Sequence, residues 1–213
     1  MAGLPERSGS QFYNSAILVG PNGFIGKYRK AHLFLNEKRY FTPGDTPFLV
    51  MDIGGPARPA MSADRQAGGA KVGLMICFDW IFPEACRSLA LKGADIICHP
   101  SNLILPYCQT AMTTRAMENG LFTITANRIG SERRNGQELT FTGGSQIVDP
   151  RGRVLAQASR DQEEVVVVEI DPIQARDKNF TASNHLFRDR RVDLYEFATN
   201  PVTPEHSCRG QGR

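Results

Sequence analysis

Three apolar runs of strand length follow one another in the middle of the chain, separated by two segments of helix length. The runs are Ala70–Ile76, Ala94–His99 and Leu121–Ala126, and the segments between them are Pro83–Lys92 and Thr110–Asn119. A glycine, Gly93 or Gly120, follows each segment, as is common where a helix ends. Buried strands that alternate with helices are typical of parallel strands joined by crossover helices. The sequence therefore predicts an α/β fold.

Flanking segments add antiparallel structure and exposed chain. Ser15–Val19 and Phe24–Tyr28 surround an Asn-Gly turn, which predicts a β-hairpin. Glu163–Ile170 is rich in valine, so we expect a strand that pairs back onto the sheet. Residues 54–69, rich in glycine, proline and alanine, predict an exposed loop insertion, and 199–213 predict a disordered or partner-bound tail. Residues 1–198 are then expected to form one domain.

Composition excludes several classes of protein. A hydrophobic fraction of 41% with 22% charged residues is globular, which excludes wholesale disorder. No apolar run reaches the roughly 20 residues of a membrane helix, and the first fourteen residues lack the apolar core of a signal peptide. We therefore expect a cytoplasmic protein without a membrane partner. The net charge of +3 is too small, and its basic clusters too interrupted by acids, to indicate nucleic-acid binding.

The five cysteines predict reduced thiols. Their number is odd, no Cys-x-x-Cys pair occurs, and the four histidines are scattered along the chain. A disulfide framework and a structural zinc site are therefore both unexpected. We expect no metal and no organic cofactor.

Cys77 is the strongest candidate for chemistry, because it ends a buried strand just before a helix. Open α/β sheets place their active sites at this edge, and backbone N–H groups there lower a thiol pKa and bind an oxyanion. A buried structural cysteine is the alternative. Lys30 could stabilise a thiolate or an oxyanion, although surface roles for Lys30 and Glu37 remain open. His32 and His99 are interpreted as core or supporting residues.

Short motifs continue along the chain: Tyr28–Leu33, Glu37 before Tyr40–Gly44, Gly73–Asp79, Leu91–Asp95, His99–Asn102, Arg115–Asn119, Ala126–Gly130 and Phe141–Ser145. In type and order they resemble the nitrilase superfamily, the carbon–nitrogen hydrolases with a Glu–Lys–Cys triad, from about Glu6 to Tyr195. The resemblance implies that Cys77 attacks a carbonyl or nitrile carbon and that Lys30 stabilises the tetrahedral intermediate.

The same resemblance implies three supporting roles. The backbone N–H of Phe78 would donate to the oxyanion, and Glu37 matches an auxiliary glutamate that supports the lysine or positions substrate. Asn102 matches a residue of the substrate pocket, with a structural asparagine at a strand end as the alternative. The implied fold is an α-β-β-α sandwich, and family subunits usually pair through their helices. We therefore expect a homodimer or higher homo-oligomer.

The sequence departs from the family before Lys30. The family's general base is a glutamate well upstream of the lysine, whereas the only carboxylate before Lys30 is Glu6, which matches a later family position. We therefore expect an N-terminally truncated member that lacks its first strand–helix unit. The expected reaction is thiol-dependent hydrolysis of a small amide, carbamoyl compound or nitrile, with ammonia released. The alternative is a catalytically inactive chain that acts as a binding or assembly subunit.

Overall fold

The computed structural model describes residues 1–54, 69–134 and 136–195. The predicted insertion at 54–69 lies almost wholly outside these residues, and the predicted tail at 199–213 lies entirely outside them. The chain divides into two compact units, Met1–Lys178 and Asn179–Arg213.

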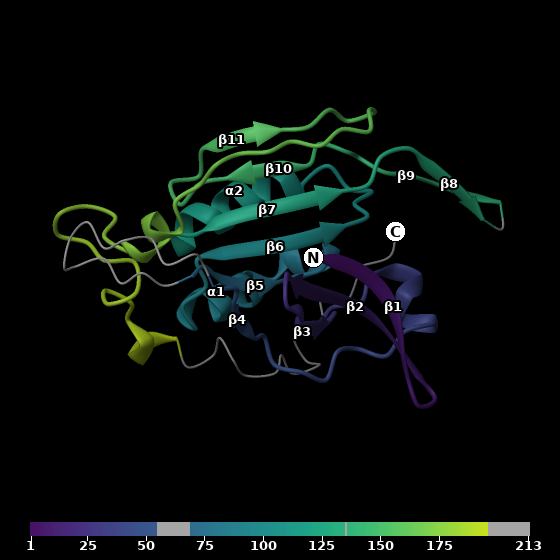
Figure 1. The fold of residues 1–213 in the computed structure, drawn as a ribbon, viewed down its shortest axis with the longest axis horizontal. Helices are drawn as coiled ribbons and strands as arrows, with labels where there is room; N and C mark the ends of the chain where they lie inside the picture. The colour runs from purple at the N-terminus through teal and green to yellow at the C-terminus, as the bar shows by residue number, and fades with distance from the viewer. Residues whose placement is uncertain (55–68, 135, 196–213) are drawn as a thin grey trace, which may run out of the picture. The chain divides into compact units, whose positions relative to one another are not determined.

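A six-stranded mixed sheet forms the centre of the first unit (Figure 1), in the order β11-β10-β7-β6-β5-β4. Its strands are β4 (Val50–Asp52), β5 (Lys71–Leu74), β6 (Ile96–Ser101), β7 (Phe122–Asn127), β10 (Gln146–Val148) and β11 (Val154–Gln157). Strands β5, β6 and β7 are parallel, and the other pairs are antiparallel. The predicted α/β fold with a parallel centre is confirmed.

Two helices cover one face of this sheet, α1 (Pro83–Leu91) and α2 (Cys108–Asn119). Leu89 of α1 is fully buried, and a Cβ atom added at Gly73 of β5 would lie 3.0 Å from its side chain. Glycine at position 73 therefore lets α1 approach the strand that leads to Cys77. Gly120 has φ 57° and ends α2 in the left-handed conformation, as the sequence indicates.

A second, three-stranded antiparallel sheet contains β1 (Ala2–Ser8), β2 (Gln11–Gly20) and β3 (Gly23–Arg29). The predicted hairpin corresponds to β2 and β3. Strand β1 was not predicted, because its polar residues and Pro5 give it little strand propensity. A Cβ atom at Gly3 of β1 would lie 3.8 Å from Cβ of Pro100, so β1 approaches the end of β6. Within the described ranges both α-helices pack on the six-stranded sheet, and none covers this second sheet.

One strand prediction is wrong. Glu163–Ile170 pairs with no strand among the described residues, and the side chains of Val165 and Val167 are 90% and 86% exposed. Its valines therefore lack the burial that makes strand propensity effective. A hairpin that was not predicted contains β8 (Ser131–Arg134) and β9 (Gln137–Thr140), and these two strands pair with no other described strand.

Short 3-10 helices complete both units. In the first unit they are η1 (Leu35–Arg39), η2 (Cys77–Ile81) and η3 (Pro172–Arg176). The second unit contains η4 (Val192–Leu194) and one antiparallel bridge between Asn179 and His185. Within the described ranges, no helix combines the length and apolar character needed to cross a membrane.

Candidate active site

A buried ion pair lies at the end of β3. The Nζ atom of Lys30 is 2.5 Å from Oε2 of Glu37, and the Lys30 side chain has no solvent exposure. Lys30 follows β3 directly, and its backbone N–H donates to the carbonyl of Asn14 on β2. The lysine is therefore held by the sheet rather than by a free loop.

Glu37 is held by three donors at the start of η1. Its Oε2 atom accepts from Lys30 and from the backbone N–H of Phe34 at 2.7 Å, and its Oε1 accepts from the Asn14 side chain at 2.8 Å. Leu35, the first residue of η1, has φ 45°. A non-glycine residue in the left-handed region costs about 1–2 kcal/mol, so the surrounding contacts enforce this turn.

Cys77 begins η2 immediately after the continuation of β5. It has φ 44°, and it shares positive φ with only Leu35 among the described non-glycine residues. Its half-buried thiol donates to the backbone carbonyl of Asn102, with Sγ 3.8 Å from the oxygen. The two strained turns of the described chain are thus those that carry Cys77 and Glu37, and strain of this kind gathers at functional sites.

Aromatic side chains connect the segment around η1, which contains Glu37, to η2, which contains Cys77. The rings of Phe34, next to η1, and Phe78, in η2, have centroids 4.7 Å apart. Phe78 also meets Phe82 edge-on at 5.6 Å. The residue that donates to Glu37 therefore packs on the residue that follows Cys77.

Burial raises the pKa of the Cys77 thiol, and the charges of the ion pair act on it in opposite directions. The Lys30 ammonium lowers this pKa, as does the hydrogen bond with the backbone of Phe78, whereas the Glu37 carboxylate raises it. The sequence-based expectation of a lowered thiol pKa is wrong for the structure as described, because desolvation is the largest effect. Lys30, Glu37 and the Phe78 N–H nevertheless all act on this one sulfur.

Asp79, in η2, is fully buried and supports the site through hydrogen bonds. Its carboxylate accepts from the Tyr28 hydroxyl, from Nδ1 and the backbone N–H of His32, and from the backbone N–H of Ile76, all within 3.2 Å. His32 stacks on Phe82 with 3.8 Å between ring centroids. Asp79 therefore ties the end of β3 to η2. The sequence analysis placed Asp79 in a motif but gave it no role.

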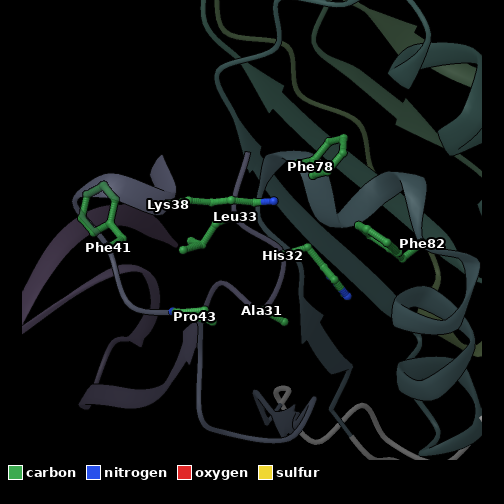
Figure 2. Close-up of a pocket in the computed structure, with 8 residues that line it drawn as sticks. All are labelled: Ala31, His32, Leu33, Lys38, Phe41, Pro43, Phe78 and Phe82. Atoms are coloured by element: carbon green, nitrogen blue, oxygen red, sulfur yellow. The ribbon is translucent and has the colours of Figure 1, made fainter. Parts of the chain in front are cut away.

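Two cavities meet at Phe78. The smaller, about 10 Å³, adjoins the thiol and has room for about one water. Its lining comprises Phe34, Cys77, Phe78, Trp80, Asn102, Leu103, Ile104 and Leu105. The larger, about 420 Å³, is shown in Figure 2 and is lined by Ala31, His32, Leu33, Lys38, Phe41, Pro43, Phe78 and Phe82. Cys77 lines the smaller cavity, whereas Cys77, Lys30 and Glu37 are all absent from the lining of the larger one.

The structure thus brings together the five residues singled out from the sequence. Lys30 and Glu37 form one ion pair, Cys77 and Phe78 begin η2, and Asn102 contributes its backbone carbonyl while its side chain is exposed. Within the described ranges, no three His, Cys, Asp or Glu side chains gather as a metal site would require. In such an arrangement a thiol can attack an electrophilic carbon, and an ammonium and a backbone N–H can stabilise the anion that results.

Comparisons with known proteins agree with this geometry. The carbon–nitrogen hydrolase family model matches residues 1–178. A nitrilase from Pyrococcus abyssi is 50% identical over 195 residues, which are 92% of this chain and 68% of that protein. An (R)-stereoselective amidase from Pseudomonas sp. is 36% identical over 196 residues, 90% of this chain and 64% of the amidase. The chain therefore spans about two thirds of the length of these relatives.

A solved structure gives the same result for the fold. The crystal structure of a carbon–nitrogen hydrolase from Helicobacter pylori G27 superposes with a TM-score of 0.77 at 30% identity, covering 94% of this chain and 71% of that one. The nitrilase-like α/β fold expected from the sequence is confirmed. Family model, relatives and fold agree with the ordered motifs around Lys30 and Cys77, and the chain belongs to the carbon–nitrogen hydrolase family of the nitrilase superfamily.

Proposed function

We propose that this chain hydrolyses a non-peptide carbon–nitrogen bond in a small amide, carbamoyl compound or nitrile, with Cys77 as the nucleophile. The observation that carries the proposal is the Lys30 ammonium, fully buried against Glu37 and acting electrostatically on the Cys77 thiol. Burying a lysine ammonium costs stability unless the charge is paired, and buried charged groups of this kind are typical of functional sites. The similarity to a nitrilase and an amidase supports this choice of substrate class.

For an amide, the proposed reaction has two steps. The Cys77 sulfur attacks the carbonyl carbon, the carbon–nitrogen bond breaks, and ammonia leaves with the thiol proton, so that a thioester remains. Water then attacks the thioester, which gives the carboxylic acid and regenerates the thiol. For a nitrile, addition of the thiol gives a thioimidate, which one water converts to the thioester with loss of ammonia.

Each neighbouring group has a role in these steps. The Lys30 ammonium and the Phe78 N–H stabilise the negative charge that develops on the substrate oxygen or nitrogen. Glu37 holds the Lys30 ammonium in place through its 2.5 Å contact. Asn102 is exposed and lies next to the thiol, so it would contact the part of the substrate beside the reacting carbon.

The test combines thiol labelling with turnover. The 213-residue chain is treated with iodoacetamide across a pH range, the label is located by mass spectrometry, and ammonia release is measured with a panel of amides, carbamoyl compounds and nitriles. We expect selective labelling of Cys77 and turnover of at least one substrate class. Cys77→Ser should abolish both. Cys98→Ser is the matched control, because Cys98 is also half-buried and its burial raises its pKa to about 11.

Two results would contradict the proposal in different ways. Selective labelling of Cys77 without any turnover would mean an assembled but inactive site, as a binding or assembly subunit would have. Slow labelling spread over the cysteines would mean that the site around Cys77 is not assembled in solution. If turnover occurs and Glu37→Gln abolishes it without unfolding the chain, Glu37 is needed for the chemistry.

A further inference from the structure

His99 contacts the backbone of the nucleophile from inside the core. Its ring is fully buried on β6, and its Nε2 atom lies 2.8 Å from the carbonyl oxygen of Cys77. A carbonyl oxygen only accepts hydrogen bonds, so Nε2 carries the proton in this contact. The donor is therefore directed at a residue whose φ is 44°.

The sheet register produces this contact. Strands β5 and β6 are parallel, and their ladder continues past Leu74 through the bond from the Met75 N–H to the Cys98 carbonyl. This register brings the residues after Met75 beside those after Cys98. His99 consequently reaches the first residue of η2 without any loop between them.

A second contact fixes the tautomer of the ring. Thr125 is the register partner of His99 on β7, and its Oγ1 lies 3.2 Å from Nδ1. The Ser101 hydroxyl is also close, 3.4 Å from Nδ1 and 3.2 Å from Nε2. With Nε2 donating to Cys77, Nδ1 is the acceptor, and the Thr125 hydroxyl donates to it. Burial lowers the pKa of His99 to about 4, so the ring is neutral near pH 7.

We propose that His99 is a positioning residue that holds Cys77 in its left-handed conformation and thereby directs the thiol toward Lys30 and the Phe78 N–H. The inference rests on the proposed function, in which that sulfur reacts. A cysteine in the left-handed region relaxes to an extended or helical conformation unless its backbone is restrained. Rotation of this backbone would move Sγ and the following N–H together, so one hydrogen bond controls both groups.

The test compares a substitution that removes the donor with one that restores it. His99→Phe keeps a ring of similar size without an N–H group, whereas His99→Gln places an amide N–H at about the reach of Nε2. The readouts are the rate of iodoacetamide alkylation of Cys77, and kcat and KM for a substrate that the wild-type chain turns over. We expect His99→Phe to lower the alkylation rate and kcat roughly tenfold, the value of one hydrogen bond, with KM little changed. His99→Gln should recover most of both rates.

A matched pair on β7 provides a second arm that leaves the histidine in place. Thr125→Val removes the hydroxyl that donates to Nδ1 and should lower both rates in the same direction, though less. Thr123→Val is the control, because Thr123 is fully buried on the same strand and its hydroxyl has no partner among the described residues. Thermal unfolding of each variant shows whether it is folded. If His99→Phe does not fold, the comparison of Thr125→Val with Thr123→Val tests the proposal instead.

Three results would overturn the positioning role: equal losses in His99→Phe and His99→Gln, no loss in either, or the same loss in Thr123→Val as in Thr125→Val. Alkylation needs no substrate, so the two proposals can fail separately. A chain without turnover that still shows the expected alkylation rates would refute the proposed function and keep the role of His99. Turnover by the wild-type chain, with alkylation and turnover rates unchanged in every variant, would support the proposed function and refute the role of His99.

Discussion

The Nζ atom of Lys30 lies 2.5 Å from Oε2 of Glu37, and the lysine side chain has no exposure whereas the glutamate side chain is 24% exposed. The positive charge is thus the buried partner, and the carboxylate that compensates it is partly exposed. The ion pair with Glu37 offsets the cost of burying the Lys30 ammonium at this depth. The same pair places two opposite charges near one thiol.

Removing either charge should therefore shift the Cys77 pKa, in opposite directions. Lys30→Met removes the cation that lowers this pKa, so the thiol should titrate at higher pH than in the wild-type chain. Glu37→Gln removes the anion that raises it, so the thiol should titrate at lower pH. The pH dependence of iodoacetamide alkylation measures both shifts. Lys38→Met is the control, because Lys38 is not part of the Lys30–Glu37 ion pair.

A shift in the same direction for both variants would mean that structural disturbance, not charge, dominates. Turnover should fall in both, and in Lys30→Met by roughly 10²-fold or more, which is typical when one oxyanion donor is lost. A Lys30→Met variant with full activity would exclude Lys30 from the chemistry.

The left-handed backbone at Cys77 makes a prediction about stability that is independent of catalysis. Cys77→Ala and Cys77→Gly should both be inactive, because neither has a nucleophile. Glycine adopts φ 44° without the steric penalty that alanine has, so Cys77→Gly should be as stable as Cys77→Ala or more stable by up to about 1 kcal/mol. Elsewhere glycine is normally the less stable of the two. Urea denaturation of both variants gives the comparison, and a clearly more stable alanine variant would contradict the strained geometry.

The sequence predicted the parallel centre of the sheet because its strands and helices are each marked by an apolar pattern and a closing glycine. It also selected Lys30, Glu37 and Cys77, through the resemblance of ordered motifs. It failed where structure depends on distant partners. Strand β1 is stabilised by pairing with β2 despite its polar sequence, whereas Glu163–Ile170 has strand-forming residues but no partner strand in the described part of the chain.

The same limit applies within the site. The thiol pKa depends on burial, which no local motif reveals, and the sequence-based direction was wrong for that reason. The contact between His99 and Cys77 depends on the register of β5 against β6. Sequence reasoning therefore selected candidate residues that the fold brings together, but it did not show the electrostatic balance among them.

Glu6 should contribute an acid-sensitive part of the stability. Its carboxylate binds Arg29 and Lys27, and accepts from the Ser15 hydroxyl, which together hold its pKa at about 2. Because the folded pKa is below the unfolded value of about 4.5, the stabilisation is complete above that value and is lost as pH falls toward 2. Between pH 6 and pH 2, the free energy of unfolding measured by denaturation should therefore fall less with decreasing pH in Glu6→Gln than in the wild-type chain. Equal pH dependence in both proteins would show that this ion cluster does not stabilise the fold.

Asp79 should be more important for stability than any exposed carboxylate. Each of its two oxygens accepts from one backbone N–H, Oδ1 from His32 and Oδ2 from Ile76. In Asp79→Asn one of these oxygens becomes an NH₂ group, so at least one buried N–H must face another donor. We expect the free energy of unfolding to fall by about 1–3 kcal/mol, the usual cost of a buried unsatisfied donor.

Asp45→Asn is the matched control for this experiment. Asp45 also forms an ion pair, with Arg29, but its side chain is 53% exposed, so its loss should cost about 1 kcal/mol or less. Urea midpoints and slopes for the two variants give the comparison. Asp79→Asn should also slow alkylation of Cys77, because Asp79 joins the backbone before η2 to the residues after Lys30. Destabilisation with an unchanged alkylation rate would limit Asp79 to folding, and equal stability of the two variants would contradict the hydrogen-bond arrangement described for its carboxylate.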